Sequence, residues 1–205
     1  MRPWARLRKA VDCKLTARLA PVASTLTSRT LIRPSRDSDI AALTEIYAFH
    51  VRNGSGTFEI EAPTEADMVR RRADVTSKGL PWLVAETSGV VRGYAYANHF
   101  RPRPAYRFCL EDSIYLAPDA AGRGLGRALL RELLARCEAA GARQMLAVIG
   151  DSGNAASIGL HLALGFEPTG TIHAAGWKFD RWLDVVVMQK SLGHGSSSAP
   201  VDGGP

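Results

Sequence analysis

The stretch from Glu111 to Gly126, EDSIYLAPDAAGRGLG, constrains the fold of this chain more than any other segment. A strand-like run ends in a Pro/Asp/Ala turn, and a glycine-spaced loop then leads into the helical pattern RALLRELLARCEAAG. The loop glycines are Gly122, Gly124 and Gly126. Because glycine has no Cβ, the backbone here can approach a ligand closely and point its N–H groups at it. Those groups lie at the positive end of the helix dipole, so the loop predicts a site for a pyrophosphate-sized anion, with Arg123 and Arg127 adding positive charge.

The glycine spacing excludes two common phosphate-binding loops. A dinucleotide fingerprint needs G-x-G-x-x-G near the start of a βαβ unit, whereas this loop reads G-x-G-x-G and follows the fourth expected strand. A nucleotide triphosphatase loop needs Lys followed by Ser or Thr, and the sequence has Arg127-Ala128 instead. A tight turn that binds no ligand is the alternative interpretation of this loop.

Positive charge is concentrated at the N-terminal end of the chain. Residues 1–36 hold nine Lys or Arg and one acid, Asp12, so most of the net charge of +6 comes from this segment. The remainder is close to balanced, which argues against a basic nucleic-acid-binding face on the folded part. We expect a basic, disordered extension over 1–28, one folded domain over 29–192 and a disordered, low-complexity tail over 193–205. A transit peptide, or a start of translation assigned too early, are alternative interpretations of the extension.

The rest of the composition indicates a globular protein in a reducing compartment. No apolar run approaches the roughly 20 residues of a membrane span, so we expect no membrane partner. The three cysteines, Cys13, Cys109 and Cys137, are widely spaced, which favours a cytoplasmic location. No group of Cys or His has the spacing of metal ligands, so no metal is expected.

Hydrophobic periodicity predicts an alternation of strands and helices. Expected strands cover residues 30–33, 81–86, 90–98, 108–116 and 143–149, with two more within 166–188. Expected helices cover residues 40–47, 64–79, 125–141 and 154–164. Thr64 and Asp67 predict an N-cap pair for the second helix. This order, with a βαβ crossover over 111–149, predicts a mixed α/β sheet.

Two motif blocks resemble the GNAT acetyltransferases. The glycine loop resembles their pyrophosphate loop, Gln/Arg-x-x-Gly-x-Gly/Ala, although Ala121 stands at the Gln/Arg position. The block GDSGNAASIGLHLALGFE, residues 150–167, resembles their Asn-x-x-Ser/Ala-x-x-x-Tyr-x-x-x-Gly-Phe block after the fifth strand. The sequence of this block is most similar to that of the phosphinothricin/methionine sulfoximine N-acetyltransferase branch. The segments PWLVA at 81–85, SIYL at 113–116 and GWKF at 176–179 extend the likeness over nearly the whole folded part.

This resemblance implies the GNAT fold, an α/β architecture with a mixed sheet of about seven strands, splayed between the fourth and fifth, and four helices. It also implies a homodimeric enzyme that moves an acetyl group from acetyl-CoA to the α-amine of a small amino acid such as phosphinothricin, methionine sulfoximine or methionine sulfone. A protein N-terminus or another small amine is the alternative acceptor. An acetyl-CoA sensor without turnover, and a nucleic-acid module carried by the basic arm, are alternatives from other classes.

The resemblance assigns the catalytic base to Glu111, where a carboxylate can take the proton that an α-ammonium must lose before it attacks. A solvated carboxylate paired with Arg107 is the alternative. Asp112 is expected to face the other side of the strand and ranks lower as a base. His161 stands where many relatives place a tyrosine acid, so it could protonate the leaving thiolate or assist the base. A packed or hydrogen-bonded helix residue is the alternative for His161.

The remaining expected site residues fall into a cofactor group and an acceptor group. The strand before the glycine loop is expected to pair with the amide-rich pantetheine arm like an added strand, and Asn154 to bind that arm or cap its helix. The residues expected to bind the cofactor are Ile114, Tyr115, Leu116, Ala121, Gly122, Arg123, Gly124, Leu125, Gly126, Arg127, Asn154 and Ser157. The residues expected to bind the acceptor's oxygens or wall its pocket are Arg101, Arg107, Phe58, Tyr47, Trp82 and Trp177. Arg103 is a further candidate, and solvated arginines and core aromatics are the alternatives.

Overall fold

The computed structural model describes residues 30–200, so the predicted basic extension and the last five residues of the predicted tail lie outside the described part. Its strands are β1 Thr30–Pro34, β2 Trp82–Thr87, β3 Val90–His99, β4 Cys109–Leu116, β5 Gln144–Gly150, β6 Glu167–Lys178 and β7 Arg181–Ser191. Its helices are α1 Ile40–Asn53, α2 Glu65–Ser77, α3 Leu125–Ala139 and α4 Ala155–Leu162, with short 3-10 turns η1 Asp37–Asp39, η2 Pro104–Tyr106 and η3 Pro118–Ala120. Helix α2 begins with the cap pair expected from the sequence, because Thr64 Oγ1 accepts from the Asp67 N–H at 3.2 Å.

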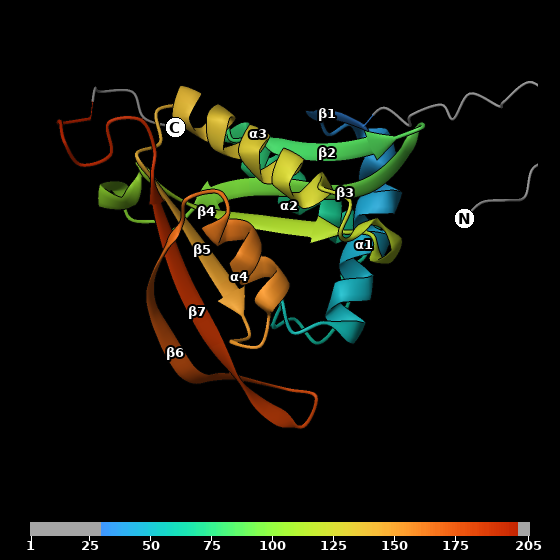
Figure 1. The fold of residues 1–205 in the computed structure, drawn as a ribbon. Coiled ribbons are helices and arrows are strands. Elements are labelled where there is room, and N and C mark those ends of the chain that lie inside the picture. Colours follow the sequence, from blue (N-terminus) through green and yellow to red (C-terminus); the bar gives the residue numbers. More distant parts are fainter. Residues whose placement is uncertain (1–29, 201–205) are drawn as a thin grey trace, which may run out of the picture.

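The strands form one sheet in the order β1-β2-β3-β4-β5-β7-β6 (Figure 1). Within residues 30–200, β4 and β5 are the parallel neighbours and every other adjacent pair is antiparallel. The predicted mixed α/β sheet of seven strands with four helices is therefore confirmed. The sequence did not predict that β7 lies between β5 and β6.

Helices cover both faces of the sheet. Successive side chains of a strand point to opposite faces, and β4 shows the division. The ring of Tyr115 meets Tyr47 of α1 edge-on, with ring centroids 4.8 Å apart. Leu116, its neighbour, lies on the other face, in contact range of Gly126 in α3. Helices α1 and α2 therefore cover one face and α3 covers the other (Figure 1).

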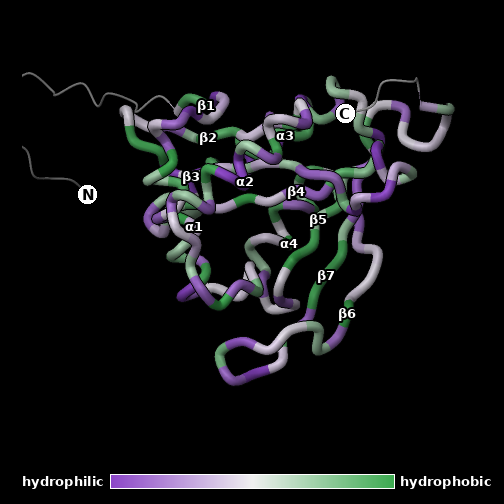
Figure 2. Tube along the Cα trace, turned by 180° about the vertical axis from the view of Figure 1, so that it is seen from behind, coloured by the Kyte–Doolittle hydropathy of each residue, from purple (hydrophilic) through white to green (hydrophobic). Residues whose placement is uncertain are grey.

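Apolar side chains at helical and strand spacing build the core. In α3, Leu129, Leu133 and Cys137 recur on one face and are fully buried. Figure 2 shows strongly apolar stretches along β2, β5 and β7. Removal of this apolar surface from water is the main force that stabilises the fold.

The sheet opens between β4 and β5, as the resemblance predicted. Their parallel pairing stops at Asp112 and Ala147. Beyond that point β4 runs on to Leu116 and pairs with β3, while β5 runs on to Gly150 and pairs with β7. The facing edges of these two strand ends therefore have no strand partner, and the strands diverge (Figure 1). This divergence positions the site described next.

Candidate active site

A groove with a volume of about 410 Å³ lies where β4 and β5 diverge. Seven residues predicted for the site line it: Ile114, Tyr115, Leu116, Ala121, Asn154, Ser157 and His161. Asp112 lines it as well, together with Phe49, His50 and Gly56, which the sequence did not single out. The Nε2–H of His50 donates to the carbonyl of Leu116 at 2.8 Å and so ties the end of β4 to α1. The two strand ends, α1 and α4 thus line one cavity.

The glycine loop leads from this groove into the N-terminus of α3. Gly122 and Gly124 have φ angles of +73° and +79°, a left-handed backbone that glycine adopts without strain. Gly124 is the N-cap residue of α3 and supplies no side-chain cap, so the first N–H groups of the helix remain available to an anion. Gly126 is required for packing, because a Cβ there would lie 3.3 Å from Leu160 Cδ2.

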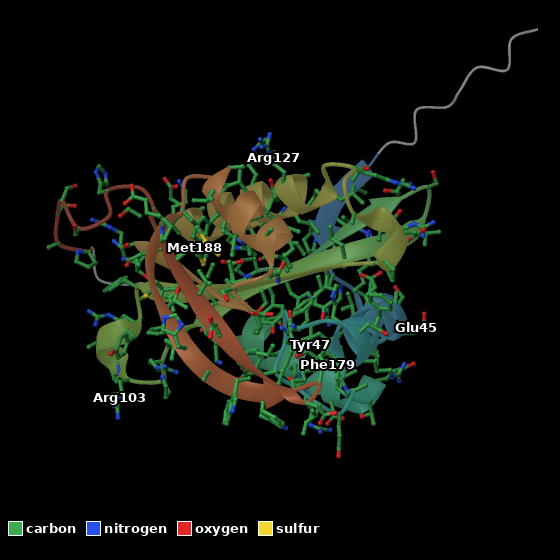
Figure 3. The ribbon with its side chains drawn as sticks, turned by 60° about the horizontal axis from the view of Figure 1, so that its bottom comes forward. Glu45, Tyr47, Arg103, Arg127, Phe179 and Met188 are labelled. Atoms are coloured by element: carbon green, nitrogen blue, oxygen red, sulfur yellow. The ribbon has the colours of Figure 1, made fainter. Side chains whose placement is uncertain are left out.

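The charged residues of the loop are exposed to solvent. Arg123 and Arg127 are both exposed, and Figure 3 shows Arg127 pointing away from the body of the protein. Leu125 is buried at the start of α3, so a contact from this residue to a ligand would come from its backbone. These positions suit phosphate groups at the surface end of the groove.

Asn154 caps α4 and lines the groove at the same time. Its Oδ1 accepts from the Ser157 N–H at 3.2 Å, and its Nδ2 donates to the carbonyl of Gly150 at 3.1 Å. Asn154 is therefore the N-cap residue of α4, as the capping interpretation expected. Because the same two bonds fix the turn between β5 and α4, Asn154 also shapes the wall of the groove.

Glu111 lies beside the point where β4 and β5 separate, opposite Asn98 of β3. It is half-buried, and burial raises the pKa of its carboxyl group above the ordinary value. The nearby charge of Asp112 raises this pKa further, whereas Arg101 lowers it. Among residues 30–200 Glu111 forms no ion pair, so the suggested pairing with Arg107 is not seen. A carboxylate with a raised pKa is suited to take a proton near neutral pH.

Asp112 and His161 form a buried pair at the groove. Their side chains are 1% and 2% exposed, and His161 Nε2 lies 3.1 Å from Asp112 Oδ2. The other ring nitrogen, Nδ1, must carry a hydrogen, because its partner at 2.7 Å is the carbonyl of Ser157, which can only accept. Burial alone lowers the pKa of His161, but the hydrogen bond and charge of Asp112 and the Ser157 carbonyl together raise it above the ordinary value.

This arrangement changes the interpretation of both residues. The sequence ranks Asp112 low as a base because it faces away from Glu111, and it does, but its side chain bonds His161 and both residues line the groove. His161 has both ring nitrogens bonded to protein atoms, so no free N–H points at a leaving group. His161 is therefore a packed, hydrogen-bonded helix residue, which is the alternative interpretation given above. A contact over 49 residues between strand and helix leaves no signal in local sequence.

A polar network on the α1 side of β4 was missed by sequence reasoning. Arg71 donates two hydrogen bonds to Glu59, at 2.7 and 3.0 Å. Tyr47, whose hydroxyl lies 2.9 Å from Thr57 Oγ1, also donates to Glu59 at 2.9 Å. Burial raises the pKa of Tyr47 to about 12, so the phenol stays a donor at neutral pH. The predicted pocket residue Tyr47 is thus fixed by a carboxylate and an arginine that lie in a loop and in α2.

The loop between α1 and α2 is clamped to the end of β6. The ammonium of Lys178, 4% exposed, donates to the carbonyls of Gly54 at 2.9 Å and Thr57 at 2.8 Å. The ring of Phe58 packs so closely that a Cβ at Gly176 would lie 2.4 Å from it. The predicted residue Phe58 therefore sits between β5 and β6, where two glycines leave room for its ring.

The predicted arginines lie together on the segment between β3 and β4. Arg101 stacks over the ring of Phe100 at 4.6 Å, and Arg107 over Phe108 at 4.4 Å. Both guanidinium groups are exposed. Arg103 also points outward, as Figure 3 shows. Exposed, stacked guanidinium groups are available for a carboxylate or phosphinate at the edge of the site.

The two predicted tryptophans are not brought together with Tyr47 and Phe58. Trp82 is 3% exposed and stacks on Tyr96 with ring centroids 4.2 Å apart, so it belongs to the core. Trp177 is 57% exposed on β6 and meets Trp182 of β7 edge-on. None of the four predicted aromatics lines the groove, because hydrophobic side chains in a motif do not reveal which face of the sheet they occupy.

In residues 30–200, no three His, Cys, Asp or Glu side chains gather as metal ligands would. In the same part of the chain, every helix is too short or too polar to cross a membrane.

Comparison with known proteins decides the family. The profile of the Acetyltransferase (GNAT) family matches residues 43–166, a segment that contains the diverging strands, the glycine loop and all but the last residue of the block over 150–167. The chain belongs to the GNAT acetyltransferase family. The groove of this GNAT chain therefore occupies the place where the resemblance predicted acetyl-CoA.

Individual relatives resemble this chain in sequence, and a solved structure resembles it in fold. The GNAT chain is 53% identical to the phosphinothricin N-acetyltransferase of Alcaligenes faecalis over 169 residues, 82% of this chain and 86% of the relative. It is 42% identical to an L-methionine sulfoximine/L-methionine sulfone acetyltransferase of Pseudomonas paraeruginosa over 161 residues, 77% and 93% of the two chains. A crystal structure of a phosphinothricin acetyltransferase from Sinorhizobium meliloti in complex with AcCoA has a TM-score of 0.83 and 48% identity, and covers 85% of this chain and 94% of that one.

Proposed function

We propose that this GNAT enzyme transfers the acetyl group of acetyl-CoA to the α-amine of a small amino acid of the phosphinothricin, methionine sulfoximine or methionine sulfone type. The names of the relatives give the acceptor class. The observation that carries the proposal is the unpaired edge of β4 beside Glu111, because it offers both a place for the thioester arm and a base next to it.

The groove supplies the contacts that the cofactor needs. Beyond Asp112 the backbone of β4 has no partner on the β5 side, so its N–H and C=O groups can pair with the two amides of the pantetheine arm. The uncapped N–H groups of α3 can hold the pyrophosphate, with Arg123 and Arg127 nearby. Ala121 lines the groove where relatives carry Gln or Arg, so the backbone carries more of the phosphate binding in this chain.

Glu111 is proposed as the base. The α-ammonium of the acceptor loses a proton to this carboxylate, directly or through a water, and the free amine then attacks the thioester carbonyl. A C–N bond forms, the C–S bond breaks, and the second proton of the amine goes to the departing thiolate of coenzyme A. The raised pKa of Glu111 makes the proton transfer less uphill than it would be to an ordinary glutamate.

Arg101 and Arg107 are proposed to bind the acceptor's carboxylate and side-chain oxygens. Their exposed guanidinium groups lie on the segment that leads into β4, and Arg101 is close enough to Glu111 to lower its pKa. An acceptor anchored by Arg101 would therefore present its amine near Glu111. Arg103 is a third cation on this segment and is proposed to assist in binding the same oxygens.

A panel of acceptors with detection of released thiol tests this function. Phosphinothricin, methionine sulfoximine and methionine sulfone should release coenzyme A well above the background hydrolysis of acetyl-CoA, and ordinary amino acids should be slower. Peptides with a free N-terminus serve as the comparison for the alternative acceptor. Turnover of the peptides with none of the amino acids would contradict the proposal.

We also propose a homodimer in the cytoplasm. The β6–β7 hairpin exposes four large apolar side chains, Ile172, Trp177, Phe179 and Trp182, and such a patch favours contact with another chain. Cys109 and Cys137 are free thiols, as expected in a reducing compartment. Light scattering of the wild type and of Trp182→Ser tests the dimer, which the substitution should weaken.

A further inference from the structure

The groove is closed at one end, and Asp112 lies at that end. Pairing of β4 with β5 begins at Asp112 and Ala147, so the cavity cannot continue past them. Its other end reaches Ala121, which precedes the uncapped N-terminus of α3. Between them β4 extends four residues from Asp112 to Leu116, about 13 Å. If the proposed function holds, the pyrophosphate lies at the α3 end and the acyl group at the closed end.

The closed end is rigid. His161 is held by Asp112 on one ring nitrogen and by the Ser157 carbonyl on the other, so the ring cannot turn without breaking a bond. The ring of Phe166 packs against it edge-on, with centroids 4.9 Å apart. Ala147, 1% exposed, completes the wall from β5. A larger ligand would have to displace this pair rather than push aside a flexible side chain.

The closed end also contains a polar atom without a hydrogen bond. Asp112 Oδ1 is buried and has no hydrogen-bond partner among the described residues. A methylene packed against such an oxygen could not supply the missing hydrogen bond, so a longer acyl chain would be held against an unsatisfied carboxylate oxygen, which is unfavourable. We propose that the Asp112–His161 pair is the end wall of the acyl site and restricts the donor to acetyl-CoA, so that both residues determine specificity for the acyl group.

The wild-type protein and two substitutions at Asp112 test this inference. Binding of coenzyme A, acetyl-CoA, propionyl-CoA and butyryl-CoA is measured by calorimetry, and kcat/KM for the three donors is measured with one acceptor. In the wild type, affinity and kcat/KM should fall with each methylene beyond acetyl. Asp112→Ala should raise the propionyl-to-acetyl ratio of kcat/KM by about tenfold. Asp112→Asn keeps the shape of the wall and should leave the ratio near that of the wild type.

A control variant separates the effect of this wall on donor choice from a general loss of stability. Leu43→Ala removes a fully buried side chain of α1 that does not line the groove, and it should lower stability without changing the ratio. Equal binding of propionyl-CoA and acetyl-CoA by the wild type would overturn the inference, and so would an unchanged ratio in folded Asp112→Ala. Because the binding series needs no acceptor, it decides the inference even if every amino acid in the panel fails as a substrate.

Discussion

Glu111 and Asp112 are adjacent in β4, yet they lie on opposite faces of the sheet: Asp112 bonds His161 of α4, and Glu111 lies on the face that also carries Tyr115. Two neighbouring carboxylates can therefore have separate tasks. In the proposals above, Glu111 meets the acceptor, while Asp112 shapes the site of the donor. The predictions below depend on this division.

Glu111→Gln should lower kcat by roughly 10²–10⁴-fold, because the amide cannot take a proton from the acceptor. Steady-state rates at saturating acceptor measure the effect. The affinity for acetyl-CoA should not change, since the groove residues are untouched. A loss of less than a few-fold would exclude the carboxylate as the base.

Activity should depend on pH through Glu111. A base must be deprotonated, so kcat/KM should rise with pH and level off above a pKa that is higher than the ordinary 4.5. Because Arg101 lowers this pKa, Arg101→Gln should move the acid limb of the profile to higher pH. Identical acid limbs in the two proteins would separate Arg101 from Glu111.

Arg107→Ala should raise KM for the acceptor several-fold and leave acetyl-CoA binding unchanged, because it removes a cation for the acceptor's oxygens and lies outside the groove. Arg131→Ala, which removes an exposed arginine from α3, is the matched control. If both variants keep the wild-type KM, the acceptor's carboxylate binds elsewhere.

Lys178→Met should destabilise the fold by about 1–3 kcal/mol, because the carbonyls of Gly54 and Thr57 lose their buried donor. The midpoint of thermal unfolding measures this change. Lys190→Met, on the neighbouring strand β7 with a less buried side chain, serves as control. An unchanged midpoint for Lys178→Met would mean that the loop over residues 54–58 is held by Phe58 alone.

The Asp112–His161 pair should make stability pH-dependent. The folded pKa of His161 is raised above its unfolded value near 6.5, so the contribution is complete below that pH and is lost as pH rises through the higher folded pKa. Urea unfolding at several pH values measures it, with the difference between wild type and Asp112→Asn as the readout. A difference that grows from pH 6 to pH 9 would contradict this sign.

Local patterns predicted local structure well. The Thr64–Asp67 cap, the glycine loop that opens α3 and the leucine face of α3 each depend on residues a few positions apart. The splay and the groove followed from motifs that the chain shares with the GNAT family. Seven of the predicted site residues line one cavity for this reason.

The sequence could not predict contacts between distant segments. Glu59 and Arg71 lie 12 residues apart on a loop and a helix whose relative placement depends on tertiary packing. Lys178 meets the loop over residues 54–58 across more than 120 residues. Trp82 was expected in the pocket because it belongs to a shared motif, but stacking on Tyr96 buries it in the core.

Strand β7 is the last strand along the described chain, yet it lies between β5 and β6. During translation, β5 therefore emerges long before its hydrogen-bonding neighbour. Until Arg181–Ser191 leave the ribosome, one edge of β5 stays open, and an open edge is a template for pairing with other chains. Nascent polypeptides stalled before Arg181 should consequently be the species that chaperones must shield, whereas chains that contain β7 can close that edge themselves.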